Sequence, residues 1–127
     1  MFSLTNKTAI VTGGGSGIGK AISTVFSKQG AIVHLFDMDD AGGASTVEEI
    51  KKSGGIAFFH HCDVSSQAEV KRITTSIVEE NAGIAILVNN AGIAHVGNAE
   101  TTNEEDFDRL LRVNVKGVYN CLHEILP

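Results

Sequence analysis

The sequence is poor in several residue types, and each shortage narrows what the protein can be. It contains no tryptophan, one proline and two cysteines among 127 residues. Two cysteines, Cys62 and Cys121, make no disulfide framework, so we expect free thiols in a reducing cytoplasm. The single proline is the final residue, and no low-complexity tract interrupts the chain. Nothing in the composition therefore suggests a linker between domains.

Positive charge is scarce as well. Lys and Arg number 10 against 15 Asp and Glu, which gives a net charge of -5. Nucleic acids and anionic membranes are bound by basic patches, so this balance argues against both as partners. The apolar runs are only a few residues long, far below a transmembrane span, and the N-terminus resembles no secretory signal. We therefore expect a globular cytoplasmic protein.

Apolar runs typical of strands alternate with helical patterns along the whole chain. Strands are expected at 7–12, 31–36, 56–62 and 84–88. The alternation predicts an α/β fold of the Rossmann type, a doubly wound parallel sheet with helices on both faces. Right-handed crossovers nearly fix the topology of such a sheet. In the Rossmann arrangement the strand order should be 3-2-1-4. A ligand is then expected at the switch point between strands 1 and 4.

The helices between these strands carry their own start and stop signals. Gly30, Gly54 and Gly83 follow the first three helical patterns. Two capping-box pairs mark helix starts, Ser66 with Glu69 and Thr102 with Glu105. The second pair should open one long helix. Its apolar stripe consists of Phe107, Leu110, Leu111, Val115, Val118, Leu122 and Ile125.

A glycine-rich turn, TGGGSGIG at 12–19, lies between the first strand and the first helix. Glycines at such a turn let the backbone approach a phosphate closely, and the helix start offers free N–H groups. Gly14, Gly19 and Lys20 also match the P-loop pattern, but the next residue is Ala21, which has no hydroxyl to hold magnesium. Asp37 ends the second strand, where an acid can bind ribose hydroxyls. These residues favour a dinucleotide, with a P-loop nucleotide site as an alternative.

Four motifs in order resemble the classical short-chain dehydrogenase/reductase family. They are TGGGSGIG at 12–19, Asp63-Val64, Asn89-Asn90-Ala91-Gly92 and, in the last helix, Asn114. The resemblance covers essentially the whole chain. It implies a nicotinamide cofactor, interconversion of a small-molecule alcohol and carbonyl, and a homo-oligomer, either a dimer or a tetramer. It also implies that residues 1–127 are the N-terminal half of the dinucleotide-binding domain.

The resemblance assigns roles to individual residues. The turn should wrap the adenosine ribose and pyrophosphate, Asp37 should bind the ribose diol, Asp63 and Val64 should flank adenine, and the segment after the fourth strand should line the cofactor. The cofactor-binding residues are then Gly13, Ser16, Gly17, Ile18, Gly19, Asp37, Asp63, Val64, Asn90, Ala91 and Gly92. Asp37 would repel a 2′-phosphate, so the cofactor should be NAD.

The resemblance also identifies what is missing. Asn114 would be the catalytic asparagine that organises water, and its place on the apolar stripe predicts a buried amide. The family's catalytic serine and Tyr-x-x-x-Lys pair have no counterpart here, because the only tyrosine, Tyr119, precedes His123 by four residues. A cofactor-binding or interaction chain without catalysis is therefore an alternative function.

The histidines give weaker indications of function than these motifs. His60, His61 and Cys62 are adjacent on a strand, where alternate residues face opposite sides, so no metal site is expected. His34 should be a core histidine in the second strand. His95 should lie in a loop after the fourth strand, near the nicotinamide end of the site.

Overall fold

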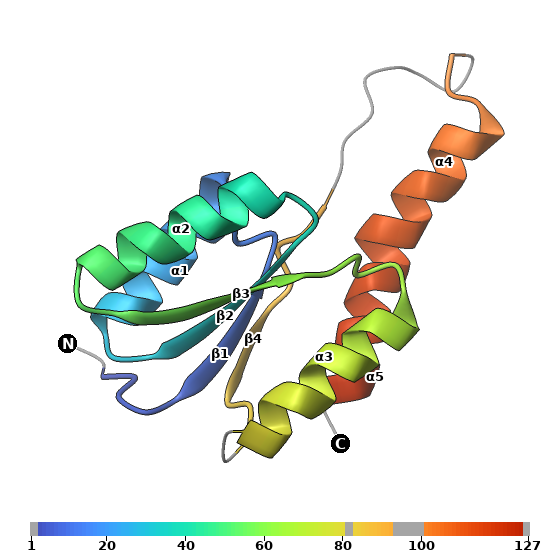
Figure 1. Ribbon diagram of the computed structural model, residues 1–127. Helices are drawn as coiled ribbons and strands as arrows, with labels where there is room; N and C mark the ends of the chain where they lie inside the picture. The colour runs from blue at the N-terminus through green and yellow to red at the C-terminus, as the bar shows by residue number, and fades with distance from the viewer. Residues whose placement is uncertain (1–2, 81–82, 93–100, 126–127) are drawn as a thin grey trace.

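The computed structural model describes residues 3–80, 83–92 and 101–125. In chain order the elements are β1 (Thr8–Thr12), α1 (Gly17–Lys28), β2 (Ile32–Asp37), α2 (Asp40–Lys52), β3 (Ile56–His61), α3 (Gln67–Glu80), β4 (Ile86–Val88), α4 (Glu104–Leu111), η1 (Arg112–Lys116) and α5 (Gly117–Ile125). All four expected strands are present (Figure 1), each within one or two residues of its expected ends.

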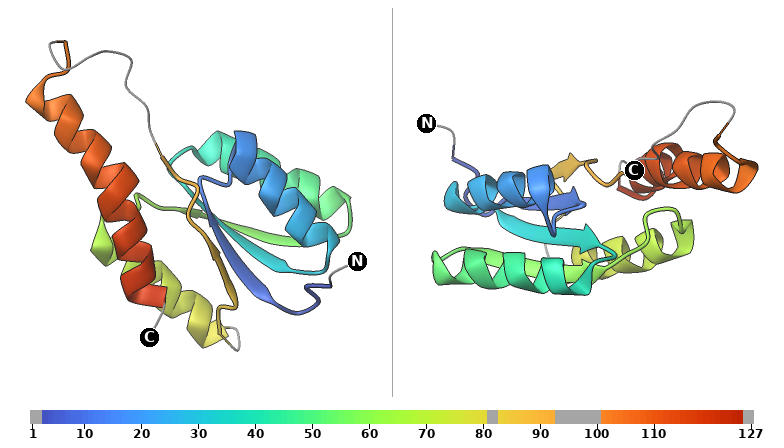
Figure 2. Two further views of the ribbon diagram at one scale, coloured as in Figure 1. Left: turned by 180° about the vertical axis from the view of Figure 1, so that it is seen from behind. Right: turned by 90° about the horizontal axis from the view of Figure 1, so that it is seen from above.

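The strands form one parallel sheet in the order β3-β2-β1-β4, as the sequence predicted. β1 is fully buried along its length because helices cover both faces of the sheet. Figures 1 and 2 show α1 and α2 on one side of the strands, and α3 with α5 on the other. β4 forms an edge of this sheet, and among the described residues no strand pairs with its outer side.

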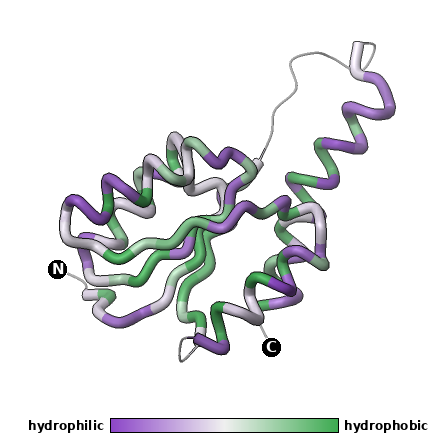
Figure 3. The backbone as a smooth tube through the Cα atoms, in the orientation of Figure 1, coloured by the Kyte–Doolittle hydropathy of each residue, from purple (hydrophilic) through white to green (hydrophobic). Residues whose placement is uncertain are grey.

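Two hydrophobic cores hold the layers together. One lies under α1 and α2 and is built around Val11, Val33, Leu35 and Ile50. The other lies under α3 and α5 and includes Ile10, Phe36, Ile73 and Cys121. Figure 3 shows hydrophobic residues along the central strands, with mixed hydrophobic and hydrophilic residues on the helices. None of the helices in the described ranges has the length and apolar composition to cross a membrane.

Helix starts follow the capping signals in one case and depart from them in the other. The Ser66 hydroxyl accepts a hydrogen bond from the Glu69 amide at 3.3 Å, as expected. Thr102 is not the cap of the last helix. Asn103 caps it instead, accepting from the Asp106 amide at 2.8 Å. Asparagine is at least as good an N-cap as threonine, so the start moves by one residue.

The last helix is not a uniform α-helix, and only part of its predicted apolar stripe faces the core. The π-helical turn η1 joins α4 to α5, and the apolar side chains Phe107, Val115 and Tyr119 are all more than half exposed. The buried positions of α5 are Gly117, Asn120 and Cys121. Gly117 lets α5 approach Val64 closely, and Ile125 is the stripe residue that packs against the core.

Candidate functional site

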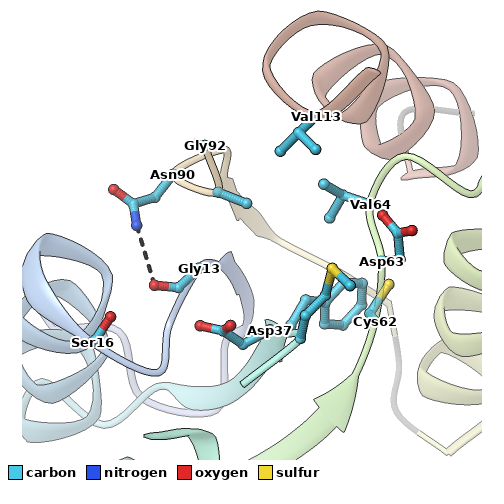
Figure 4. Close-up of a pocket in the computed structure, with 12 residues that line it drawn as sticks. Gly13, Ser16, Asp37, Cys62, Asp63, Val64, Asn90, Gly92 and Val113 are labelled. Atoms are coloured by element: carbon cyan, nitrogen blue, oxygen red, sulfur yellow. Dashed lines mark hydrogen bonds between the residues drawn. The ribbon is translucent and has the colours of Figure 1, made fainter. Parts of the chain in front are cut away.

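A pocket lies where the carboxyl ends of the parallel strands meet, at the switch point between β1 and β4. Four chain segments and the π-helical turn supply its walls: the turn after β1, the end of β2, and the segments after β3 and β4. Figure 4 shows Gly13 and Ser16 on one side, Asp63 and Val64 on the other, and Asp37 between them. The lining comprises Gly13, Ser16, Phe36, Asp37, Met38, Cys62, Asp63, Val64, Asn90, Ala91, Gly92 and Val113.

Most of the predicted cofactor residues therefore share one pocket. Gly17, Ile18 and Gly19 are not part of its lining but form the first turn of α1 beside it. Phe36, Met38, Cys62 and Val113 line the pocket without having been predicted. Phe36 and Met38 flank Asp37, and Cys62 precedes Asp63. Their position in sequence next to motif residues could have indicated that they line the pocket. The roles of all these residues as cofactor contacts stay predictions.

The glycine turn is built for close backbone contacts. Gly13 has a φ of +68°, and its carbonyl oxygen accepts a hydrogen bond from Asn90 Nδ2 at 3.2 Å. A Cβ on Gly19 would overlap that carbonyl, so only glycine fits there. Gly17 differs, because its φ is +55° and a Cβ would meet only open space. The turn thus leaves room at the start of α1, where free amides and the helix dipole favour an anion.

Asp37 is held by backbone amides at the end of β2. Its Oδ2 accepts from the Gly15 amide at 2.9 Å, and its Oδ1 accepts from the Asp39 amide at 2.9 Å. Gly15 makes this possible, since a Cβ there would lie 2.8 Å from Asp37 Oδ2 and 3.0 Å from the Gly43 nitrogen. The carboxylate is therefore fixed at the mouth of the glycine turn.

Thr12 joins the two motifs on either side of the switch point. Its hydroxyl accepts from the amides of Asn90 and Ala91, both at 2.9 Å, and donates to the Val88 carbonyl at 3.3 Å. Thr12 is 2% exposed, so these bonds are shielded from water. Thr12 belongs to the predicted glycine motif, but no contact was predicted for its side chain. A hydroxyl at the end of a buried strand could have indicated that Thr12 has hydrogen-bond partners.

Asn114 is not buried, contrary to the prediction. It is exposed in the π-helical turn η1, where Val113 packs against the core in its place. A Cβ on Gly92 would lie 3.2 Å from Asn114 Oδ1, so the amide reaches the segment after β4, at the rim of the pocket. Single π-helical turns often mark functional sites. A catalytic role for Asn114 stays a prediction.

Both cysteines of the chain are buried in the core. Burial raises the pKa of Cys62 to about 12 and that of Cys121 to about 11, so both thiols stay protonated at neutral pH. Within the described ranges no group of three or more His, Cys, Asp or Glu residues could hold a metal. His95 lies outside the described residues.

His34 is a core histidine, as expected, and it contacts His60. Its Nδ1 lies 2.8 Å from His60 Nε2, and its ring stacks on Phe58. Burial, with a smaller effect of His60, lowers the pKa of His34 to about 4, and burial is also the main cause that lowers the pKa of His60. His61 is exposed on the other side of β3 and contacts Asp40 at 2.7 Å, as strand alternation predicted.

Comparison with known proteins shows where this arrangement recurs. Residues 7–127 match the family model described as short chain dehydrogenase. The chain belongs to the short-chain dehydrogenase family. The strand order and the pocket at its switch point are therefore the family's Rossmann-type architecture.

Three relatives illustrate how similar the chain is to known proteins in sequence and structure. An uncharacterized oxidoreductase of Thermotoga maritima is 47% identical over 89% of the chain. The structure of a 3-ketoacyl-(acyl-carrier-protein) reductase from Brucella melitensis complexed with NADH is 39% identical over 98% of the chain, with a TM-score of 0.91. A metagenomic short-chain oxidoreductase in complex with NADP is 33% identical over 99% of the chain, with a TM-score of 0.94.

The chain spans about half the length of these short-chain dehydrogenases. It covers 44% of the Thermotoga protein, 50% of the Brucella protein and 57% of the metagenomic one. Two of them are complexes with a nicotinamide dinucleotide, NADH in the Brucella reductase and NADP in the metagenomic oxidoreductase.

Proposed function

We propose that the protein is an NAD-dependent oxidoreductase that interconverts a small-molecule alcohol and its carbonyl compound by hydride transfer. Residues 1–127 would form the N-terminal, cofactor-binding half of its dinucleotide-binding domain. The observation that carries the proposal is the Asp37 carboxylate, fixed by the Gly15 and Asp39 amides in a pocket at the switch point of the sheet. An acid at this place accepts hydrogen bonds from a ribose diol and repels a 2′-phosphate.

The residues present fit a dinucleotide. The open space at Gly17 and the positive φ at Gly13 leave the backbone accessible to a pyrophosphate beside the start of α1. Asp63 and Val64 would contact the adenine, and Asn90, Ala91 and Gly92 would line the rest. NAD held by these residues would supply the hydride acceptor for the alcohol carbon. The chain's own residues bind and orient, and Asn114 at the pocket rim would order water.

The proton that accompanies the hydride needs a separate group. The family resemblance implies a serine and a Tyr-x-x-x-Lys pair for this step, and the 127 residues contain no Tyr-x-x-x-Lys pattern. A positioned acid or base contributes about 10²- to 10⁴-fold in rate. We therefore expect no turnover from residues 1–127 alone. A chain that binds the cofactor without catalysis is the second candidate function.

The experiment follows reduction of NAD by absorbance across a panel of secondary alcohols, and oxidation of NADH across the matching ketones. It uses the natural full-length protein and the 127-residue chain side by side. Turnover by the full-length protein alone supports the proposal. Absence of turnover from the full-length protein in both directions, with NAD still bound, would leave the non-catalytic function. Turnover by the 127-residue chain would assign proton transfer to Tyr119, His123 or His95.

A P-loop nucleotide site has less support. The residue after Lys20 is Ala21, which offers no oxygen to magnesium. Lys20 itself forms an ion pair with Glu49 at 2.9 Å on α2. ATP should therefore bind no more tightly with magnesium than without it, in a titration of the full-length protein. Tight binding that depends on magnesium would replace the dinucleotide proposal by the P-loop one.

We also propose that the protein forms a homo-oligomer in the cytoplasm, with the last helix at the interface between subunits. The apolar side chains along the outer face of that helix are exposed, and an apolar stripe of this length favours burial against another chain. Its members are Phe107, Leu111, Val115, Tyr119 and Leu122. The two cysteines are free thiols, in keeping with a reducing compartment.

A further inference from the structure

The side chain of Asn120 ties α5 to the segment that follows β3. It is completely buried. Its Nδ2 donates to the Val64 carbonyl oxygen at 2.8 Å, and its Oδ1 accepts from Gln67 Nε2 at 3.2 Å. Leaving a buried amide or carbonyl without a partner costs about 1–3 kcal/mol. These bonds therefore hold the Val64 backbone at a fixed place relative to α5.

Gly117, one turn earlier on α5, packs against the side chain of Val64. A Cβ on Gly117 would lie 2.6 Å from Val64 Cγ2, so α5 can approach this closely only because position 117 has no side chain. Asn120 thus contacts the backbone of Val64 while Gly117 contacts its side chain. The two contacts are independent, since one is a hydrogen bond and the other is van der Waals packing.

Val64 belongs to a turn that keeps its own shape. Asp63 Oδ1 accepts from the Ser65 amide at 3.0 Å and from the Ser65 hydroxyl at 2.6 Å. The Ser66 amide also donates to the Asp63 carbonyl at 2.9 Å. Because the turn is closed by its own bonds, a displacement of Val64 carries Asp63 with it. Both residues line the pocket (Figure 4).

We propose that Asn120 is a positioning residue for the adenine end of the cofactor, acting through Val64 to set the place of the Asp63 carboxylate. The inference rests on the NAD site proposed above. An ionised carboxylate only accepts hydrogen bonds, so Asp63 would recognise the amino group of adenine. The π-helical turn η1, which continues into α5, places Asn114 beside Gly92. The last helix therefore contacts two segments of the pocket wall, the one after β3 and the one after β4.

The experiment measures the affinity of the full-length protein for NAD and for its deaminated analogue, in which a keto oxygen replaces the adenine amino group. An acceptor placed for an amino group should favour NAD by about tenfold, as the loss of one hydrogen bond to a charged group implies. In Asn120→Leu the ratio should fall to about twofold or less, because the shifted carboxylate no longer meets the amino group. Gly117→Ala displaces Val64 by the other route and should lower the same ratio.

Gly117→Ala keeps the hydrogen bonds of Asn120, and the higher helix propensity of alanine, up to about 1 kcal/mol over glycine, offsets part of the cost of displacing Val64. Thr74→Val is the matched control. Thr74 is a buried polar residue of α3 whose hydroxyl donates to the Val70 carbonyl at 2.8 Å, away from the pocket. The control should lower the melting temperature and leave the affinity ratio unchanged.

The outcomes separate this inference from the function on which it rests. If the unsubstituted protein binds neither dinucleotide, the proposed function fails and the inference with it. If it prefers NAD and both α5 variants keep that preference, Asn120 is only structural and the inference is overturned. The same holds if Thr74→Val erases the preference as fully as the α5 variants do.

Discussion

Acid should destabilise this fold through its buried histidine pair. His34 is 2% exposed, and its Nε2 has no hydrogen-bond partner among the described residues. Its Nδ1 lies 2.8 Å from His60 Nε2, so one ring must donate and the other accept. Protonating both rings would place two positive charges in contact within an apolar layer. Glu80 and Arg72 act on the pKa of His60 in opposite directions, Glu80 raising it and Arg72 lowering it.

The magnitude follows from the pKa of His34 in the two states. The unfolded value is 6.5, and burial lowers the folded value to about 4. Between these values the unfolded chain binds a proton that the folded chain does not. The contribution of His34 is therefore complete above about pH 6.5 and is lost as the pH falls toward about 4. At about pH 5 the loss is about 2 kcal/mol, a substantial part of the stability of a typical domain.

Urea unfolding at about pH 8 and about pH 5 measures this loss, with His34→Phe as the test variant. Phenylalanine cannot titrate and can still stack on Phe58, so the variant should lose about 2 kcal/mol less than the unsubstituted protein over this range. His61→Gln, on the exposed side of the same strand, is the control and should keep the full dependence. Equal pH dependence in His34→Phe and the unsubstituted protein would refute the argument.

Three further predictions concern the site and the interface. Gly17→Val should weaken NAD binding by more than about a hundredfold, because valine fills the open space at the start of α1. Gly54→Val, also at a positive φ with open space but far from the pocket, should leave the affinity unchanged. Thr12→Val should lower stability by about 1–3 kcal/mol per amide left without a partner, as read by thermal unfolding, and a change below about 0.5 kcal/mol would argue against the hydroxyl's role. Val115→Asp should dissociate the oligomer in light scattering without loss of fold, and an unchanged mass would remove the outer helix face from the interface.

The fold was predictable because one signal repeats along the chain. Apolar β-type runs alternate with helical patterns, and right-handed crossovers leave few strand orders for such a chain, of which 3-2-1-4 is the Rossmann one. The expected order 3-2-1-4 is the observed one. Helix ends were less certain, since Asn103 competes with Thr102 as the cap and either can satisfy the first amides.

Helix orientation was less predictable, for a physical reason that α1 and α5 share. The fully buried positions are small or polar, Gly19, Ser23 and Ser27 in α1 and Gly117, Asn120 and Cys121 in α5. In both, apolar side chains such as Ile18 and Tyr119 are left exposed. Hydrophobic periodicity finds an apolar face, but it does not tell which face lies close enough to its neighbour to need small residues.

The site could be predicted in part. Asp37 and Asp63 follow strands, and the carboxyl ends of parallel strands meet at one edge of a sheet. Their common pocket therefore follows from the topology. Asn120 could not be found this way, because its partners Val64 and Gln67 lie more than fifty residues away in sequence. A polar residue among apolar neighbours of a helix indicates only that some partner exists.

The central claim, that Asp37 makes this pocket a site for NAD, is tested most directly by titrating the full-length protein with NAD and with NADP. NAD should bind more tightly, by about ten- to a hundredfold, because the carboxylate accepts hydrogen bonds from the free diol and repels a phosphate. In Asp37→Ala that preference should largely disappear. Tighter binding of NADP by the unsubstituted protein, or an undiminished preference for NAD in Asp37→Ala, would contradict it.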